Sequence, residues 1–377
     1  MIRPQLFSIL IWLTSVFTTS LFSLCAAVDA TALPVKVSSN DPQLQYQGRW
    51  TRGKPESHFA WSGSSVSIRF KGTDVNVLLT DKAKGGENKN GGVNNNYFSV
   101  IIDGGELFVF HGERDKKVYR IASGLPDGEH DLLLFKRTEA SVGVVQFHGF
   151  ELSEKASVLP PTKFSRKIEF IGDSITCGYG NEAKDETEHF SPLTENNYLA
   201  YGALTARAFG ADYTCISYSG IGVYTSRGDT KNTILTRYNK ILPCDPNAFW
   251  DYSQTTTPQV LVINLGTNDF YKDNPGENYE RCYLELLKMV RKNYPKTQIF
   301  CCLGPMMWGK IVQENKDLIM SAIQKLEDNN ITFVEFKSHN KNKSGLGADW
   351  HPSIKSHQEM SEVLIKAIEE NTDWEKL

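Results

Sequence analysis

The chain has 377 residues, of which 40% are hydrophobic and 23% charged, and its formal net charge is −3. This length exceeds one ordinary hydrophobic core, so the composition predicts more than one soluble globular domain. The charge is nearly balanced and shows no excess of the basic residues that nucleic-acid binding requires, so we expect no nucleic-acid partner.

The first 30 residues are typical of a secretory signal peptide. Arg3 precedes an apolar run over residues 6–24, which only Ser and Thr interrupt, and small residues follow. This pattern predicts cleavage near Ala27 or Ala30 and a secreted protein, with a periplasmic or cell-surface location as the alternative. The run is also nearly long enough for an uncleaved membrane anchor. No later stretch could span a bilayer, so we expect no membrane contact after cleavage.

Residues 35–155 alternate between short apolar runs and turn residues. Four of these runs, at residues 65–70, 75–79, 98–103 and 129–135, are separated by Gly, Asp and Asn. Strand after strand without a helical period predicts an all-β sandwich, jelly-roll-like, as the N-terminal domain.

The pattern changes at residues 156–164, where Pro160 and Pro161 stiffen a short linker. Over residues 165–377 strands alternate with helices, which predicts an α/β domain of three layers with a parallel sheet. The expected helices cover residues 198–209, 277–293, 312–327 and 353–370, and expected strands include residues 212–219, 297–303 and 331–336.

A serine follows the first strand of this second domain. The apolar residues 168–171 run into Gly172, and Asp173 and Ser174 suit the entry of a helix. Such a turn exposes a hydroxyl beyond the sheet edge, and the N–H groups of the new helix face any negative charge beside it. Gly-Asp-Ser is also an ordinary turn before a helix. The interpretation of Ser174 as a nucleophile therefore depends on other segments.

Three further loops carry the residue types that such a serine needs. Gly220 and Asn268 each follow an apolar strand, and His351 stands just before the last helix. Read alone, they are a turn glycine, an Asx-turn former and a loop histidine. Together they offer a general base for a serine and donors for the oxyanion of a tetrahedral intermediate. Sheets of this kind place their sites outside the carboxyl ends of the strands.

The four segments together resemble the SGNH hydrolases, esterases named for a serine, a glycine, an asparagine and a histidine. The resemblance implies that Ser174 is the nucleophile and His351 the general base. It also implies an oxyanion hole made of the N–H of Ser174, the N–H of Gly220 and the side-chain amide of Asn268.

Two stretches narrow the resemblance further. Phe-Ile-Gly-Asp-Ser-Ile-Thr-Cys-Gly-Tyr-Gly begins at Phe170, and Asp-Trp-His-Pro begins at Asp349; both are similar to carbohydrate esterase family two. That family joins an N-terminal β-sandwich to an SGNH domain and removes acetyl groups from plant polysaccharides such as xylan and glucomannan. The resemblance implies the same plan here, with residues 35–155 as the sandwich and 165–377 as the esterase domain.

One position departs from the pattern of the SGNH hydrolases. Many of them carry an aspartate three residues before the histidine, and here that position is Ala348. Asp349 stands two residues before His351 and would face the same side in an extended loop. Two versions stay open: a Ser174–His351 dyad with Nδ1 bonded to a backbone carbonyl, or a triad completed by Asp349.

Aromatic residues near these loops are candidates for sugar binding, because flat rings suit the apolar faces of pyranoses. They are Tyr179, Trp308 and Trp350, and ordinary packing is their alternative role. The cysteine spacings form no zinc pattern, so we expect neither a metal nor a cofactor.

The sequence therefore favours an exported carbohydrate O-acetyl esterase that uses a serine acyl-enzyme mechanism. Its expected partner is an acetylated polysaccharide or oligosaccharide. The alternatives are a carbohydrate-binding protein on an esterase scaffold, with little or no turnover, and a lipase or thioesterase of another SGNH lineage.

Overall fold

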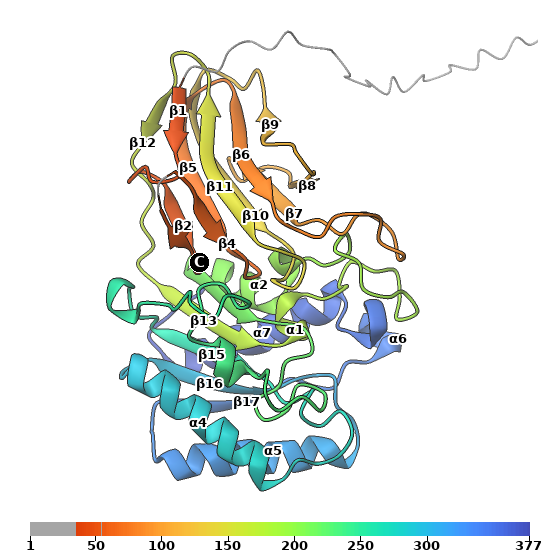
Figure 1. Cartoon of the computed structure of the whole chain (residues 1–377). Helices are drawn as coiled ribbons and strands as arrows, with labels where there is room; N and C mark the ends of the chain where they lie inside the picture. Colours follow the sequence, from red (N-terminus) through yellow and green to blue (C-terminus); the bar gives the residue numbers. More distant parts are fainter. Residues whose placement is uncertain (1–34, 54) are drawn as a thin grey trace, which may run out of the picture. The chain divides into compact units, whose positions relative to one another are not determined.

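The computed structural model describes residues 35–53 and 55–377 (Figure 1). The predicted signal peptide lies outside the described residues. Among the helices of the described part, none is long and apolar enough to cross a membrane.

The N-terminal part forms two antiparallel sheets of six strands each. One sheet has the order β3-β4-β11-β6-β9, with β1 beside β11, and the other has the order β12-β5-β10-β7-β8, with β2 beside β5. Their strands are β1 Val35–Ser38, β2 Gln45–Gln47, β3 Thr51–Arg52, β4 Ser57–Phe59, β5 Ser65–Gly72, β6 Val75–Asp81, β7 Tyr97–Ile102, β8 Phe108–His111, β9 Val118–Ala122, β10 Gly128–Lys136, β11 Val145–Leu152 and β12 Ser157–Leu159.

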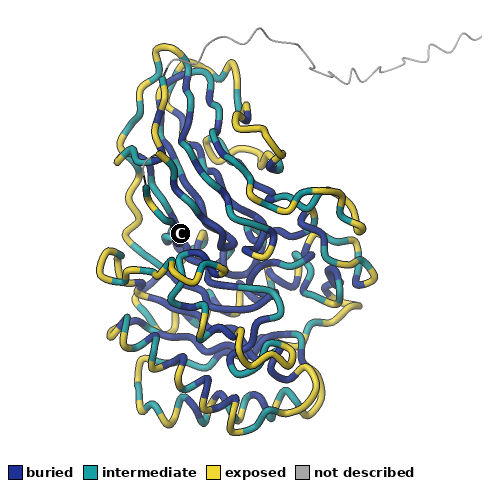
Figure 2. Tube along the Cα trace, in the orientation of Figure 1, coloured by how far each residue is buried: buried dark blue, intermediate teal, exposed yellow. Residues whose placement is uncertain are grey.

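The alternation in the sequence explains why these strands form a sandwich. Along β5 the side chains of Val66, Ile68 and Phe70 are buried, while Arg69 between them is partly exposed. Figure 2 shows the same contrast more broadly, with buried stretches in the strands of this part and exposed ones mainly in its loops. Apolar residues of period two turn to one face of a strand, and here they meet those of the facing sheet in one core. Strand β12 lies within the segment expected to be a linker and pairs with Arg69–Lys71 of β5.

The second part contains a five-stranded sheet in the order β14-β13-β15-β16-β17, in which every pairing is parallel. Its strands are β13 Lys167–Gly172, β14 Asp212–Ser217, β15 Val260–Asn264, β16 Gln298–Leu303 and β17 Ile331–Glu335. The helices are α1 Ser174–Cys177, α2 Tyr201–Ala208, α3 Ile234–Arg237, α4 Glu277–Asn293, α5 Lys310–Leu326, α6 Lys341–Ser344 and α7 Ile354–Asn371, with 3-10 turns η1 Asn197–Leu199, η2 Tyr252–Gln254 and η3 Ala348–Trp350.

Helices cover both faces of this sheet, as the sequence predicts for a three-layer domain (Figure 1). On β15 the side chains of Leu261 and Ile263 join the core that contains α4 and α5, whereas Val260 and Val262 join the core that contains α2 and α7. The apolar run of β15 is nearly continuous because both faces of this strand are covered by helices. The helix expected over residues 198–209 is interrupted at Ala200, whose ψ of 153° separates η1 from α2.

The sandwich and the α/β part share buried residues. Trp61, which follows β4, and Ala140, which follows β10, belong to the same core as the residues of α4 and α5. Phe135 at the end of β10 belongs to the other core, where it packs on Tyr213 of β14. The loops at one end of the sandwich therefore form part of the hydrophobic cores of the α/β part.

Candidate active site

The candidate nucleophile lies where β13 gives way to α1. Asp173 caps the helix, because its Oδ1 accepts the N–H of Ile175 at 3.0 Å. Ser174 is the first residue of α1 and is buried, with 6% of its surface exposed. Parallel strands end at this same edge of the sheet, so the loops after β14 and β15 reach the serine.

Ser174 and His351 are in hydrogen-bond contact. His351 Nε2 lies 2.8 Å from Ser174 Oγ, and its Nδ1 lies 3.0 Å from the carbonyl oxygen of Ala348. A carbonyl only accepts, so Nδ1 carries the proton and Nε2 is free to accept the serine proton. Ala348 is itself held in place, since its N–H donates to the carbonyl of Gly180 at 3.0 Å.

Asp349 does not reach the histidine in this geometry. Its φ of 48° and ψ of 40° are left-handed, so the loop is not extended. The side chains of Asp349 and His351 therefore do not point to the same side, as they would in an extended loop. Its carboxylate accepts hydrogen bonds from Tyr179 Oη (2.7 Å), His189 Nδ1 (2.7 Å) and the N–H of Phe190 (3.2 Å). The triad that the sequence left open is therefore not assembled, and the dyad with a backbone acceptor is.

Tyr179 packs on the imidazole. The ring centroids of Tyr179 and His351 are 4.1 Å apart at an interplanar angle of 24°, and the hydroxyl of Tyr179 is held by Asp349. The sequence suggested a sugar-binding role for Tyr179. The structure places its ring against the histidine, where it limits rotation of the imidazole. The Asp349 carboxylate thus braces the dyad through the hydroxyl of Tyr179.

Burial sets the charge of the histidine. Desolvation lowers the pKa of His351 to about 4, although the Ala348 carbonyl and the charge of Asp349 favour the protonated form. A histidine with such a pKa is neutral at neutral pH. It is therefore in the protonation state that a general base needs.

The loop after β14 leaves one backbone N–H without a protein acceptor. Over residues 218–225, within the described part of the chain, every other N–H has a partner, and only that of Gly220 has none. Gly220 has a φ of 78°, a conformation that favours glycine. The N–H of Ser174 likewise makes no hydrogen bond to a described residue. Both are available to an anion.

Asn268 bridges the two segments that carry these donors. Its Nδ2 donates to the carbonyl of Ile221 at 2.9 Å and to Oδ2 of Asp173 at 3.3 Å. Both amide hydrogens thus face protein acceptors, unlike the free donor that the sequence suggested. Burial raises the pKa of Asp173 to about 7.

Asp269 is a site residue that the sequence analysis did not identify. Its carboxylate accepts the N–H groups of Val223, Tyr224 and Thr225 at 3.0, 2.8 and 2.9 Å. It therefore fixes the segment that follows Gly220. The available signal was a second polar residue directly after Asn268 at a strand end. Burial raises the pKa of Asp269 to about 6.

The two tryptophans expected to bind sugar are both on the surface. Trp350, next to His351, is 55% exposed, and Trp308 is 49% exposed with its ring 5.1 Å from that of His339. Exposed tryptophans of this kind are suited to stacking on a sugar ring.

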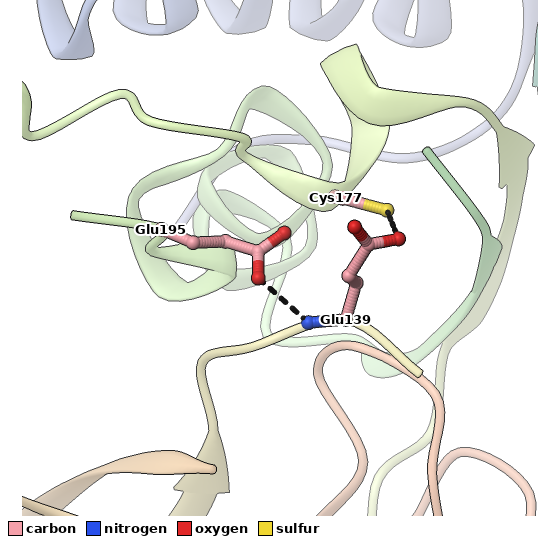
Figure 3. Close-up of side chains that lie close together, drawn as sticks. All are labelled: Glu139, Cys177 and Glu195. Carbon is pink, nitrogen blue, oxygen red and sulfur yellow. Dashed lines mark hydrogen bonds between the residues drawn. The ribbon is translucent and has the colours of Figure 1, made fainter. Parts of the chain in front are cut away.

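One group in the described residues has the composition of a metal site. Glu139, Cys177 and Glu195 are buried and offer ligand atoms within 4.8 Å of one another (Figure 3). Backbone N–H groups already donate to one oxygen of each carboxylate, at 2.8 and 2.9 Å. Protein donors therefore stabilise these carboxylates.

Comparison with known proteins agrees with this architecture. Residues 46–161 match the model "Carbohydrate esterase 2 N-terminal", and residues 170–359 match the "GDSL-like Lipase/Acylhydrolase family". The cellulase/esterase CelE of Acetivibrio thermocellus is 39% identical over 89% of this chain, which spans 40% of that relative's length. An acetylxylan esterase/glucomannan deacetylase of Cellvibrio japonicus is 28% identical over 83% of the chain and 85% of its own length.

A solved structure shows the same two-part fold. It is that of a family two carbohydrate esterase from Clostridium thermocellum in complex with cellohexaose, 39% identical, with a TM-score of 0.80 over 87% of this chain and 98% of the other. The chain belongs to carbohydrate esterase family 2, whose second part is a GDSL-like hydrolase domain.

Proposed function

We propose that this protein is an exported carbohydrate O-acetyl esterase that hydrolyses acetyl esters of plant polysaccharides, such as xylan and glucomannan, or of their oligosaccharides. The observation that carries the proposal is the 2.8 Å contact between Ser174 Oγ and a neutral His351 whose other nitrogen is held by a carbonyl. The relative from C. japonicus, an acetylxylan esterase/glucomannan deacetylase, supports the substrate class. The apolar run of residues 6–24 supports export.

The mechanism follows from the positions of these groups. Ser174 Oγ attacks the acetyl carbonyl carbon while His351 Nε2 takes its proton. The N–H groups of Ser174 and Gly220, with Asn268, stabilise the tetrahedral oxyanion. The imidazolium then protonates the departing sugar hydroxyl, which leaves an acetyl ester on Ser174. Water attacks this ester with His351 again as base, and acetate departs from the restored serine.

The imidazolium formed in each half of the cycle needs support. The Ala348 carbonyl accepts the Nδ1 proton throughout, so the positive charge lies between a carbonyl dipole and the Tyr179 face. Both interactions favour the cation. A backbone acceptor thus replaces the orienting carboxylate of a triad.

Ser174→Ala tests the mechanism. We expect it to lower acetate release from acetylated xylan, glucomannan and 4-nitrophenyl acetate at least about 10⁴-fold, because the acyl-enzyme cannot form. Ser253→Ala, an exposed serine in η2, is the matched control and should keep the wild-type rate. Near-normal turnover by Ser174→Ala, with a melting temperature equal to that of the wild type, would exclude Ser174 as the nucleophile.

Carbohydrate binding is a second candidate function of the same site. The cellohexaose complex of the relative from C. thermocellum and the exposed Trp350 beside His351 favour it. Calorimetry with cellohexaose, run beside the acetate assay, separates the two functions. Binding without acetate release from any substrate of the panel would identify a binding protein on an esterase scaffold. A preference for long-chain aryl esters over the acetate would instead identify a lipase.

A further inference from the structure

A buried carboxylate from the sandwich reaches the segments that build the candidate active site. Glu139 lies three residues beyond the end of β10 and is 2% exposed. Its side chain points toward α1, where Cys177 Sγ lies 3.8 Å from its Oε2 (Figure 3). Cys177 ends the helix that Ser174 begins.

The same carboxylate oxygen holds the loop of the candidate oxyanion hole. Glu139 Oε2 accepts the N–H of Ser219 at 2.8 Å, and Ser219 directly precedes Gly220. On the other side of Gly220, the N–H of Ile221 donates to the carbonyl of Tyr218 at 3.2 Å. The peptide that carries the free N–H of Gly220 is therefore fixed from both ends, one of which is a residue of the sandwich.

Glu139 is itself held in one position. Its N–H donates to Oε2 of Glu195 at 2.9 Å, and its carbonyl accepts the ammonium of Lys136 at 3.0 Å. Burial and the charge of Glu139 raise the pKa of Glu195 well above its usual range. The backbone of Glu139 is thus anchored at its N–H and at its carbonyl, and its side chain is left to accept the Ser219 N–H and to contact Cys177.

We propose that Glu139 is a positioning residue of the esterase, through which the β-sandwich orients the oxyanion-hole N–H of Gly220. The proposal rests on the proposed function, and it assigns to the N-terminal domain a role in turnover besides any contact with substrate. Loss of a single oxyanion donor lowers kcat about 10²- to 10³-fold. Displacement of the Gly220 N–H, which weakens this donor without removing it, should lower kcat by a smaller factor.

Two conservative variants separate reach from charge. Glu139→Gln keeps an oxygen at the same distance from the Ser219 N–H, whereas Glu139→Asp keeps the charge but withdraws it by one methylene. We expect Glu139→Asp to lower kcat on 4-nitrophenyl acetate at least about tenfold with little change in KM, and Glu139→Gln to stay within about threefold of the wild type. A role confined to charge balance predicts the reverse order.

A matched control lies at the same junction. Glu182 pairs with Arg137, which also follows β10, but has no contact with the loop of Ser219. Glu182→Ala should therefore keep the wild-type kcat. Wild-type kcat in Glu139→Asp would overturn the proposal, as would a loss that only matches a smaller folded fraction by circular dichroism.

Hydrogen–deuterium exchange of residues 218–225 gives a readout that needs no turnover. Glu139→Asp should exchange faster in this segment than the wild type, and Glu139→Gln should not. Equal exchange in Glu139→Asp and wild type would overturn the positioning role. An inactive wild-type protein with faster exchange in Glu139→Asp would instead refute the proposed function and leave the positioning contact standing.

Discussion

At the scale of single residues, the dyad depends on how little freedom its histidine has. One ring nitrogen faces Ser174, the other faces the Ala348 carbonyl, and Tyr179 covers one face of the ring. The tautomer is fixed by a backbone group, which no side-chain substitution can remove. Asp349, the carboxylate closest to His351 in sequence, supports this arrangement by accepting a hydrogen bond from the hydroxyl of Tyr179.

The lowered pKa of His351 predicts activity that persists in mild acid. A histidine with the usual pKa of 6.5 is about nine-tenths protonated near pH 5.5, whereas one with a pKa of about 4 is mostly neutral there. Protonation at lower pH removes the base, so kcat/KM should fall only as the pH approaches that pKa. We expect kcat/KM at about pH 5.5 to keep at least half of its value at pH 7.5.

A pH profile of kcat/KM on 4-nitrophenyl acetate checks this expectation. Asp173 and Asp269 titrate nearby, with pKa values raised to about 7 and about 6. The profiles of Asp173→Asn and Asp269→Asn therefore serve as controls, because an acid limb that disappears in one of these variants belongs to that carboxylate. An acid limb near pH 6.5 that persists in both variants would contradict a depressed pKa at His351.

Substitution of Asp349 should have a small effect on catalysis. The carboxylate binds Tyr179, His189 and Phe190 but not the imidazole, so Asp349→Asn is expected to lower kcat less than about tenfold. The orienting aspartate of a serine-protease triad costs about 10⁴-fold when replaced by asparagine. Steady-state kinetics and a melting curve distinguish these outcomes, since a loss of four orders without unfolding would mean that Asp349 moves onto His351 during turnover.

At the scale of elements, the site is a set of strand ends whose loops are tied to each other. Asn268, after β15, bonds to Ile221 in the loop after β14 and to Asp173 at the end of β13. Asp269 then fixes the next three N–H groups of the β14 loop. Among residues 218–225 of the described chain, only the N–H of Gly220 is left without a protein acceptor.

Asp269→Ala should disorder this loop and lower kcat by about 10²-fold, with a smaller change in KM, because three N–H groups lose their acceptor at once. The matched control is Asp229→Ala. Asp229 lies in the same loop region and accepts the N–H of Lys231 at an exposed turn. Kinetics on 4-nitrophenyl acetate check the pair, and equal rates for both variants would show that the β14 loop needs no such anchor.

Strands, helices and the residue types of the site could be predicted because they follow from local pattern. The helix expected over residues 277–293 is observed as Glu277–Asn293, and the apolar strand expected before Asn268 is observed as β15. The left-handed Asp349 could not be predicted, because it depends on the partners that Tyr179 and Phe190 provide from a distant segment. No sequence pattern marks Glu139, because its contacts with Cys177 and Ser219 form only when the sandwich packs on the α/β part.

At the scale of the whole molecule, a buried ion pair joins the sandwich to strand β13 of the α/β part. Arg49 is completely buried, its Nη2 lies 3.6 Å from Oε2 of Glu169 on β13, and it also donates to carbonyls of residues 238 and 240. Glu169 accepts in addition from the hydroxyls of Tyr238 and Tyr294, at 2.9 and 3.3 Å. The pair is thus enclosed by both parts of the fold.

Removal of Arg49 should destabilise the protein strongly. Arg49→Ala leaves the Glu169 carboxylate buried without its cation, which costs about 3–5 kcal/mol in comparable pairs. Arg69→Ala, which removes partly exposed pairs with Glu129 and Asp131, is the control and should cost less than about 1 kcal/mol. Urea unfolding gives both free energies, and equal losses would show that the buried pair carries no special weight.

The contact between Ala348 and Gly180 also limits how this enzyme can evolve. Ala348 is fully buried, and a Cβ added to Gly180 would lie 2.4 Å from its methyl group. A larger side chain at position 348 would press on this packed turn, so the aspartate that the SGNH resemblance leads one to expect there needs a change at the Gly180 turn as well. A route from the dyad to that triad therefore passes through coupled substitutions in two loops.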